Sequence, residues 1–195
     1  LFADKYIIHW IDRKSPENDA SKFIRYGLQR RNNMGNVDVN KLAEQVQLLS
    51  DIEAIKLLKY QYARGCEQAM MEGNNKPVLA TLTQDAVWDG GDFGHYEGLD
   101  QLDQFFSGLN ATFTFTWHFF TNPMIEVAGN TAKARWYMLA FYTQTEDGQD
   151  LIAITIEDDK YEKIDGKWLI SEVLLIPGVM APFKEGWSSL VMGQK

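Results

Sequence analysis

The chain has 195 residues, of which 45% are hydrophobic and 13% aromatic, and it carries a net charge of −8 at pH 7. This size and composition predict one packed globular domain with enough large side chains for a core or an apolar cavity. The acidic charge argues against a general nucleic-acid binder, because neutralising phosphates requires clustered Lys and Arg. Cys66 is the lone cysteine, so no intramolecular disulfide forms. No apolar run reaches membrane-spanning length and no signal-peptide pattern opens the chain, so we expect a cytoplasmic protein without a membrane span.

Residues 1–31 differ in charge from the rest of the chain. They contain seven Lys or Arg against four Asp or Glu, a balance of +3 (7 − 4), which leaves −11 (−8 − 3) for the remainder. A turn-rich run at 32–36 follows. We interpret 1–40 as a partly helical extension. It could pack on the main domain, on a neighbouring subunit, or remain a solvated tail.

The main domain is predicted over 41–187 and begins with helical periodicity. Apolar residues recur at helical spacing between Leu42 and Tyr62 and predict one or two helices over 41–72. A glycine and two asparagines at 73–75 end this helical region. The elements expected next are a helix at 78–82, a strand at 86–88, a loop at 89–94, a pairing segment at 95–97 and a helix at 101–109 capped by Asp100.

Everything after Asn110 is predicted to form strands joined by glycine-containing hairpin turns. The candidate strands are 112–119, 123–128, 131–144, 149–163 and 167–176. Residues from 177 onward are expected to lie over the sheet, with 188–195 as a tail beyond the domain. Helices followed by an antiparallel meander predict an α+β fold.

The candidate functional residue with the clearest pattern is His118. It ends a run from Thr112 in which polar and aromatic residues alternate, which predicts a half-buried strand. On that strand His118 shares a face with Thr114 and Thr116. A neutral imidazole held there can accept a proton near neutral pH. The alternative is a core histidine satisfied by one hydrogen bond.

Several local strings, in this order along the chain, resemble the SnoaL-like branch of the nuclear transport factor 2-like superfamily. The resemblance covers about 42–187, and the branch includes dehydratases and a dehydrochlorinase. The strings are Asp51-Ile52-Glu53-Ala54-Ile55-Lys56, Asp85-Ala86-Val87-Trp88, Asn122-Pro123-Met124-Ile125-Glu126-Val127, Ala132-Lys133-Ala134-Arg135-Trp136-Tyr137 and Lys160-Tyr161-Glu162-Lys163-Ile164-Asp165-Gly166-Lys167-Trp168. One scaffold hosts enzymes, cyclases and binders in this superfamily, so the resemblance is more specific for fold than for reaction.

The resemblance implies a cone-shaped, curved antiparallel sheet wrapped around N-terminal helices, with an apolar pocket at one end. In the family's enzymes a strand histidine is the general base, and it falls on His118. A carboxylate that orients the imidazole and a preceding tyrosine fall on Glu67 and Tyr62. Two positions depart from the family pattern: Glu67 stands where a shorter Asp is usual, and Ala140 stands where one of the dehydratases has an acid.

Each assigned role has a structural alternative. Glu67 lies off the apolar stripe of its helix and could be a solvated carboxylate. Tyr62 could donate to a developing oxyanion or be a core tyrosine. The residues expected to line the pocket are Trp136, Met138, Ala140, Tyr142, Phe93, Phe120 and Ile154.

We therefore expect a cofactor-independent lyase or isomerase that acts on a small apolar molecule with an acidic C–H, such as a steroid, a polyketide or an aromatic alcohol. The alternatives are a non-catalytic binder of such a molecule and an assembly domain. The histidines lack metal-ligand spacing, and Asp89 and Asp92 are too few for a calcium loop, so no metal and no cofactor are predicted. Related folds associate through the open sheet, so we expect a homodimer or homotrimer.

Overall fold

The computed structural model describes residues 38–184. The chain divides into two units after Glu44, and apart from residues 38–44 the elements described below belong to the second unit. The predicted extension, apart from its last three residues, and the predicted tail at 188–195 lie outside the described residues. Among the described residues no helix is both long and apolar enough to cross a membrane.

The helical region predicted over 41–72 is confirmed as one helix, α2 (Val39–Glu72). Its buried residues Ile55, Leu58 and Tyr62 follow helical spacing and face the sheet. Gly65 permits a close approach to the short helix α3 (Lys76–Leu79), because a Cβ at Gly65 would lie 2.6 Å from the backbone nitrogen of Val78. Helix α3 starts two residues earlier than predicted, since Pro77 occupies its first turn.

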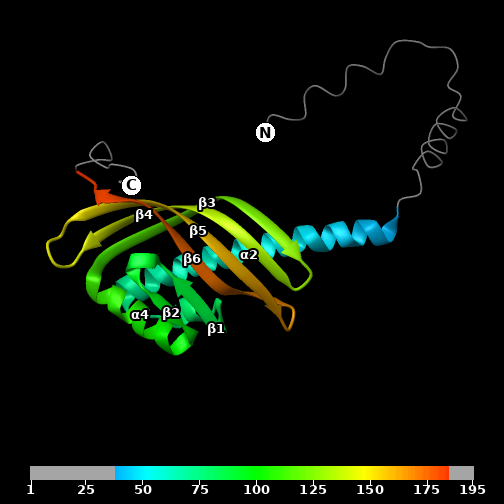
Figure 1. Ribbon diagram of the computed structural model, residues 1–195, viewed down its shortest axis with the longest axis horizontal. Helices are drawn as coiled ribbons and strands as arrows, with labels where there is room; N and C mark the ends of the chain where they lie inside the picture. The colour runs from blue at the N-terminus through cyan, green and yellow to red at the C-terminus, as the bar shows by residue number, and fades with distance from the viewer. Residues whose placement is uncertain (1–37, 185–195) are drawn as a thin grey trace, which may run out of the picture. The chain divides into compact units, whose positions relative to one another are not determined.

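The remaining elements form one six-stranded sheet and a second long helix, α4 (Gly98–Thr112). In the sheet, β1 pairs in parallel with β6, and all other neighbours are antiparallel. Figure 1 shows strands β3 to β6 curving across α2, with α4 beside β1. The α+β prediction is thus confirmed. The strands, in the order β2-β1-β6-β5-β4-β3, are β2 (His95–Glu97), β1 (Leu82–Asp89), β6 (Lys167–Pro182), β5 (Asp150–Ile164), β4 (Thr131–Gln144) and β3 (Phe113–Ala128).

The strand boundaries differ most from the prediction in β1, β3 and β6. Strand β1 begins at Leu82, four residues before the predicted start at 86 and at the last residue of the helix predicted over 78–82. The segments predicted as separate strands, 112–119 and 123–128, form one strand whose register shifts between Thr121 and Met124. Asn122 has a positive φ of 49° there, so a bulge replaces the expected break. Strand β6 also continues past the predicted end at 176 to Pro182, where it pairs with Leu151 of β5.

The start of α4 also differs from the prediction. Its N-cap is Glu97, and Asp100 lies within the first turn instead of capping the helix. Gly98, with φ of 78°, lets the chain turn directly from β2 into the helix. A carboxylate in the first turn still favours the positive end of the helix dipole.

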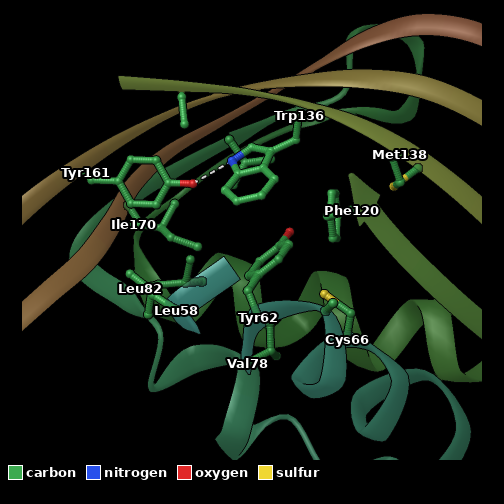
Figure 2. Packing of buried hydrophobic residues seen from close by; sticks show 14 of the residues in the cluster. Leu58, Tyr62, Cys66, Val78, Leu82, Phe120, Trp136, Met138, Tyr161 and Ile170 are labelled. Atoms are coloured by element: carbon green, nitrogen blue, oxygen red, sulfur yellow. Dashed lines mark hydrogen bonds between the residues drawn. The ribbon is translucent and has the colours of Figure 1, made fainter. Parts of the chain in front are cut away.

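The core lies between α2 and the inner face of the sheet. Alternation along β4 turns Trp136, Met138 and Ala140 inward and leaves Tyr137 exposed. Figure 2 shows the ring of Tyr62 rising from α2 toward Trp136 and Phe120 of the sheet. Sheet and helix thus share one continuous apolar cluster, which positions the site described next.

Candidate functional site

A cavity of about 290 Å³ opens between the C-terminal part of α2, α4 and the inner face of the sheet. This volume is close to the lower limit of small-molecule sites in proteins. Its walls are largely aromatic, with Trp88, Phe93, Phe105, Phe106, Phe113 and Phe120 among the lining residues. Polar or titratable groups reach it from Tyr62, Cys66, His118, Tyr142, Thr155 and Glu157.

The structure brings together part of the predicted site. The predicted residues that line the cavity are Tyr62, His118, Phe93, Phe120, Met138 and Tyr142. Trp136 and Ala140 are fully buried core residues that do not line it. Ile154 is 45% exposed on the outer face of β5, because its strand neighbours Ala153 and Thr155 take the inward positions. Glu67 is buried but does not line the cavity either.

The His118 ring is held by aromatic side chains. Its Nε2 lies 3.2 Å from the Tyr142 hydroxyl, and the ring is nearly parallel to that of Phe120. Among the described residues, its Nδ1 is buried without a hydrogen-bond partner. Burial, assisted by the positive charge of Lys59, lowers the pKa of His118 to about 4. The imidazole is therefore neutral near neutral pH, and one of its two ring nitrogens carries a lone pair.

The Glu67 carboxylate contacts the backbone of His118 and not its ring. Its Oε1 accepts a hydrogen bond of 3.2 Å from the backbone N–H of His118, and its Oε2 lies 3.2 Å from Arg64 Nη1. Glu67 therefore ties α2 to β3 at the histidine. We expected Glu67 to contact the His118 ring, but Tyr142 makes this contact instead. In the sheet, His118 pairs with Ala140 of β4, and Tyr142 lies two residues further along the same strand.

The other protic groups of the cavity are neutral. Burial raises the pKa of Tyr62 well above its ordinary value, and it also raises the pKa of Tyr142. Burial raises the pKa of Cys66 to about 12, so this thiol is not ionised near neutral pH. Tyr62 and Tyr142 thus keep their hydroxyl protons, and Cys66 is not a nucleophile.

A buried charge cluster adjoins the cavity. Lys59 Nζ lies 2.5 Å from Glu157 Oε2 and 2.8 Å from Asp159 Oδ2, and all three side chains are almost fully inaccessible to solvent. Asp159 Oδ2 also accepts a hydrogen bond of 2.6 Å from Tyr161, whose oxygen accepts one of 2.9 Å from Trp136 Nε1. Figure 2 shows this last bond. Of these three titratable side chains, Glu157 lines the cavity.

The charge cluster also reaches the aromatic wall beside His118. Lys59 Nζ lies 4.2 Å from the ring centre of Phe120 and 4.6 Å from that of Tyr62. Although burial alone would lower it, the pKa of Lys59 is raised by Asp159 and Glu157. Lys59 therefore remains a cation in contact with two rings, an attractive arrangement.

Sequence reasoning missed Lys59, Glu157 and Asp159, although two patterns mark them. Lys59 stands on the apolar stripe of α2 between Leu58 and Tyr62, where a charge is unexpected. Glu157 and Asp159 share the inward face of β5 with Tyr161. A lysine and two acids on buried faces need each other as partners.

His95 lies outside the cavity. Its side chain is 52% exposed, with Nδ1 3.2 Å from Asp89 and Nε2 3.0 Å from Glu97. Within residues 38–184, no three His, Cys, Asp or Glu side chains come close enough together to hold a metal ion.

These features define a small α+β domain with a protic, aromatic-walled cavity. The family model of the SnoaL-like domain matches residues 47–173 of this chain. The chain therefore belongs to this family.

Solved structures share the fold at low sequence identity. A putative scytalone dehydratase from Novosphingobium aromaticivorans is 21% identical, with a TM-score of 0.63 over 71% of this chain and 91% of that one. The hexachlorocyclohexane dehydrochlorinase LinA-type3 from Novosphingobium barchaimii is 21% identical, with a TM-score of 0.63 over 71% of this chain and 93% of that one. A nuclear transport factor 2-like protein from Salmonella enterica is 19% identical, with a TM-score of 0.58 over 69% of this chain and 95% of that one.

Proposed function

We propose that this chain is a cofactor-independent lyase or isomerase that removes a proton from a small, mostly apolar molecule, with His118 as the base. The observation that carries this function is the neutral His118 imidazole on the wall of an aromatic cavity, with its ring held by Tyr142. Proton transfer to a positioned base contributes about 10²–10⁴-fold to a rate. The similar fold of a dehydratase and a dehydrochlorinase, both named for eliminations, supports this reaction class.

The surrounding residues have separate roles in this mechanism. Tyr142 fixes the ring orientation, and Glu67 fixes the strand position of His118 through its backbone N–H. Tyr62 remains protonated and can donate a hydrogen bond to negative charge that develops on the substrate. The aromatic walls suit the flat rings of a steroid, a polyketide or an aromatic alcohol.

The test compares variants on two probe compounds. Wild type, His118→Gln and the exposed control His95→Gln are incubated with scytalone, monitoring loss of water, and with hexachlorocyclohexane, monitoring chloride release. Wild type and His95→Gln should turn over at least one probe, and His118→Gln should be slower by about 10²–10⁴-fold.

Two results would count against this function. Turnover by His118→Gln within a few fold of wild type would exclude His118 as the base. Tight binding of both probes without turnover would favour the second class, a non-catalytic binder that uses the same cavity.

A homodimer or homotrimer joined through the outer face of the sheet is part of this proposal. Phe115, Trp117 and Phe119 of β3 are each more than 40% exposed on that face. Sedimentation of wild type and Trp117→Lys tests it: the substitution should shift an oligomer toward the monomer, and a wild type that sediments as a monomer would contradict it.

A further inference from the structure

We propose that Glu157 is the proton donor that acts opposite His118, and that it protonates an oxygen atom leaving the substrate. This role rests on the proposed function and narrows the substrate class to molecules that lose a hydroxyl group. It follows from the charge balance around Lys59, from the hydrogen bonds of the two carboxyls, and from the place of Glu157 in the cavity.

The cluster of Lys59, Glu157 and Asp159 contains one cation and two carboxyl groups. If all three were ionised, a net charge of −1 would be buried, since their side chains are at most 5% exposed. An uncompensated buried charge is costly in a low-dielectric interior, and two neighbouring carboxylates repel each other. One added proton leaves the cluster neutral. Consistently, burial raises the pKa of both Glu157 and Asp159 above their ordinary values despite the charge of Lys59.

The hydrogen bonds indicate which carboxyl holds that proton. Asp159 Oδ2 accepts from two donors, Lys59 and Tyr161. The Tyr161 oxygen already accepts the N–H of Trp136, so its own hydrogen is directed to Asp159. Glu157 has Lys59 as its one hydrogen-bond donor among the described residues. Both donors meet Oδ2 of Asp159, whose Oδ1 is buried without a hydrogen-bond partner among the described residues. Two donors to an anion outweigh one, so we assign the proton to Glu157.

Glu157 is also the member of the cluster that a substrate can reach. It lines the cavity together with His118, and within residues 38–184 no protein hydrogen bond involves its second oxygen, Oε1. The nearby protic groups of the cavity, Tyr62, Cys66 and Tyr142, are neutral near neutral pH. The full charges that act on Glu157 are therefore those of its cluster partners.

The acid and the base together complete an elimination. The His118 imidazole takes the substrate's C–H proton, and the electron pair of that bond forms the carbon–carbon double bond. The neighbouring C–O bond breaks, and the departing oxygen keeps its electron pair and takes the proton of Glu157, so that water leaves. His118 is then an imidazolium and Glu157 a carboxylate. Transfer of one proton from the former to the latter through water restores both.

The need for an acid identifies the leaving group. Hydroxide is a strong base and departs readily only when it is protonated, whereas chloride is a weak base that gains little from a proton. A protonated carboxyl in the cavity therefore fits a dehydration better than a loss of chloride. The substrates are alcohols in which the carbon that bears the hydroxyl is bonded directly to the carbon with the acidic C–H.

Infrared spectroscopy tests the protonation state without a substrate. A protonated carboxyl shows a C=O stretching band that a carboxylate lacks. Wild type at neutral pH should show this band, the band should shift when glutamate side chains carry ¹³C, and it should vanish in Glu157→Gln but persist in the control Glu162→Gln. Absence of the band in wild type, or a shift with ¹³C-aspartate alone, would overturn the role of Glu157.

Kinetics separate this role from the function of the site. With scytalone, Glu157→Gln should lose about 10²–10⁴-fold in rate, and its loss with hexachlorocyclohexane should be smaller. Equal losses on both compounds, or no loss on scytalone while His118→Gln is inactive, would overturn Glu157 as the acid and leave His118 as the base. Activity retained by His118→Gln would instead overturn the proposed function itself.

Discussion

Within residues 38–184, two ion-paired bridges join helix α2 to the sheet, and they differ in charge balance. In the first bridge, Asp51 Oδ1 accepts hydrogen bonds from Lys163 at 2.7 Å and from Trp168 at 2.8 Å. One anion there faces one cation. In the second bridge, Lys59 faces two carboxyls, those of Glu157 and Asp159.

The pKa shifts of the carboxyls in the two bridges have opposite directions. Burial would raise the pKa of Asp51, but its hydrogen bonds, above all that from Lys163, lower it below the ordinary value. Burial, the largest cause, instead raises the pKa values of Glu157 and Asp159, although the charge of Lys59 acts in the opposite direction. A balanced bridge holds a permanent anion and serves stability. An unbalanced bridge beside a cavity holds an exchangeable proton, which suits catalysis.

The largest expected effect comes from removing the cation of the second bridge. Lys59→Met leaves two carboxyls buried without a counter-charge, which should lower the free energy of unfolding by about 3–5 kcal/mol. The control is Lys56→Met, one turn away, whose partner Glu53 is mostly exposed and whose loss should cost less than about 1 kcal/mol. Urea unfolding measures both. If Lys59→Met lowered the free energy of unfolding as little as Lys56→Met does, the two buried carboxyls would not depend on Lys59.

The second bridge also influences His118, whose pKa is lowered to about 4 by burial and by Lys59. Between pH 6.5 and 4 the unfolded chain binds a proton at His118 that the folded chain does not, so stability falls as the pH falls through this range. The loss should approach roughly 3 kcal/mol, and it should be absent from His118→Gln. Thermal unfolding across this pH range checks the difference. Identical pH profiles would contradict a buried neutral imidazole.

The first bridge should contribute less than the second. Asp51→Asn removes the charge but keeps an acceptor for Trp168, so we expect a loss of about 1–2 kcal/mol in urea unfolding. Since folding lowers the pKa of Asp51, this contribution is complete above the ordinary value of 3.8 and disappears as the pH falls through the folded value. The exposed Glu53→Gln is the control. A loss as large as that of Lys59→Met would remove the distinction between the bridges.

The smallest expected effect is that of Glu157→Gln. Glutamine has nearly the shape of a protonated glutamic acid, so the free energy of unfolding should change by less than about 1 kcal/mol. Asp159→Asn should cost more, because it disturbs the bonds of an anion to Lys59 and Tyr161. Guanidinium unfolding of the two variants compares them. The reverse order of stability would place the proton on Asp159.

Periodicity and turn chemistry predicted most of the fold. The apolar stripe from Leu42 to Tyr62 indicated α2, and glycine-containing turns separated β4, β5 and β6. The bulge at Asn122 could not be read in this way, because a break and a bulge leave the same local pattern.

The site was less accessible to sequence reasoning. Alternation along β3 indicated that His118 shares a face with Thr114 and Thr116, and His118 lines the cavity. Which group meets the His118 ring depends on strand register, and this favoured Tyr142 over Glu67. The pairing of Lys59 with Glu157 spans 98 residues and became visible only when α2 was placed against the sheet.

The neutral base in the cavity is tested most directly by an NMR titration of the ring nitrogens in ¹⁵N-histidine protein. The His118 signals are assigned by their absence from His118→Gln. We predict a neutral His118 ring at pH 7 that titrates near pH 4, well below the exposed His95, whose pKa is raised by its hydrogen bonds to Glu97 and Asp89. A His118 ring that is already protonated near neutral pH would contradict its role as the base.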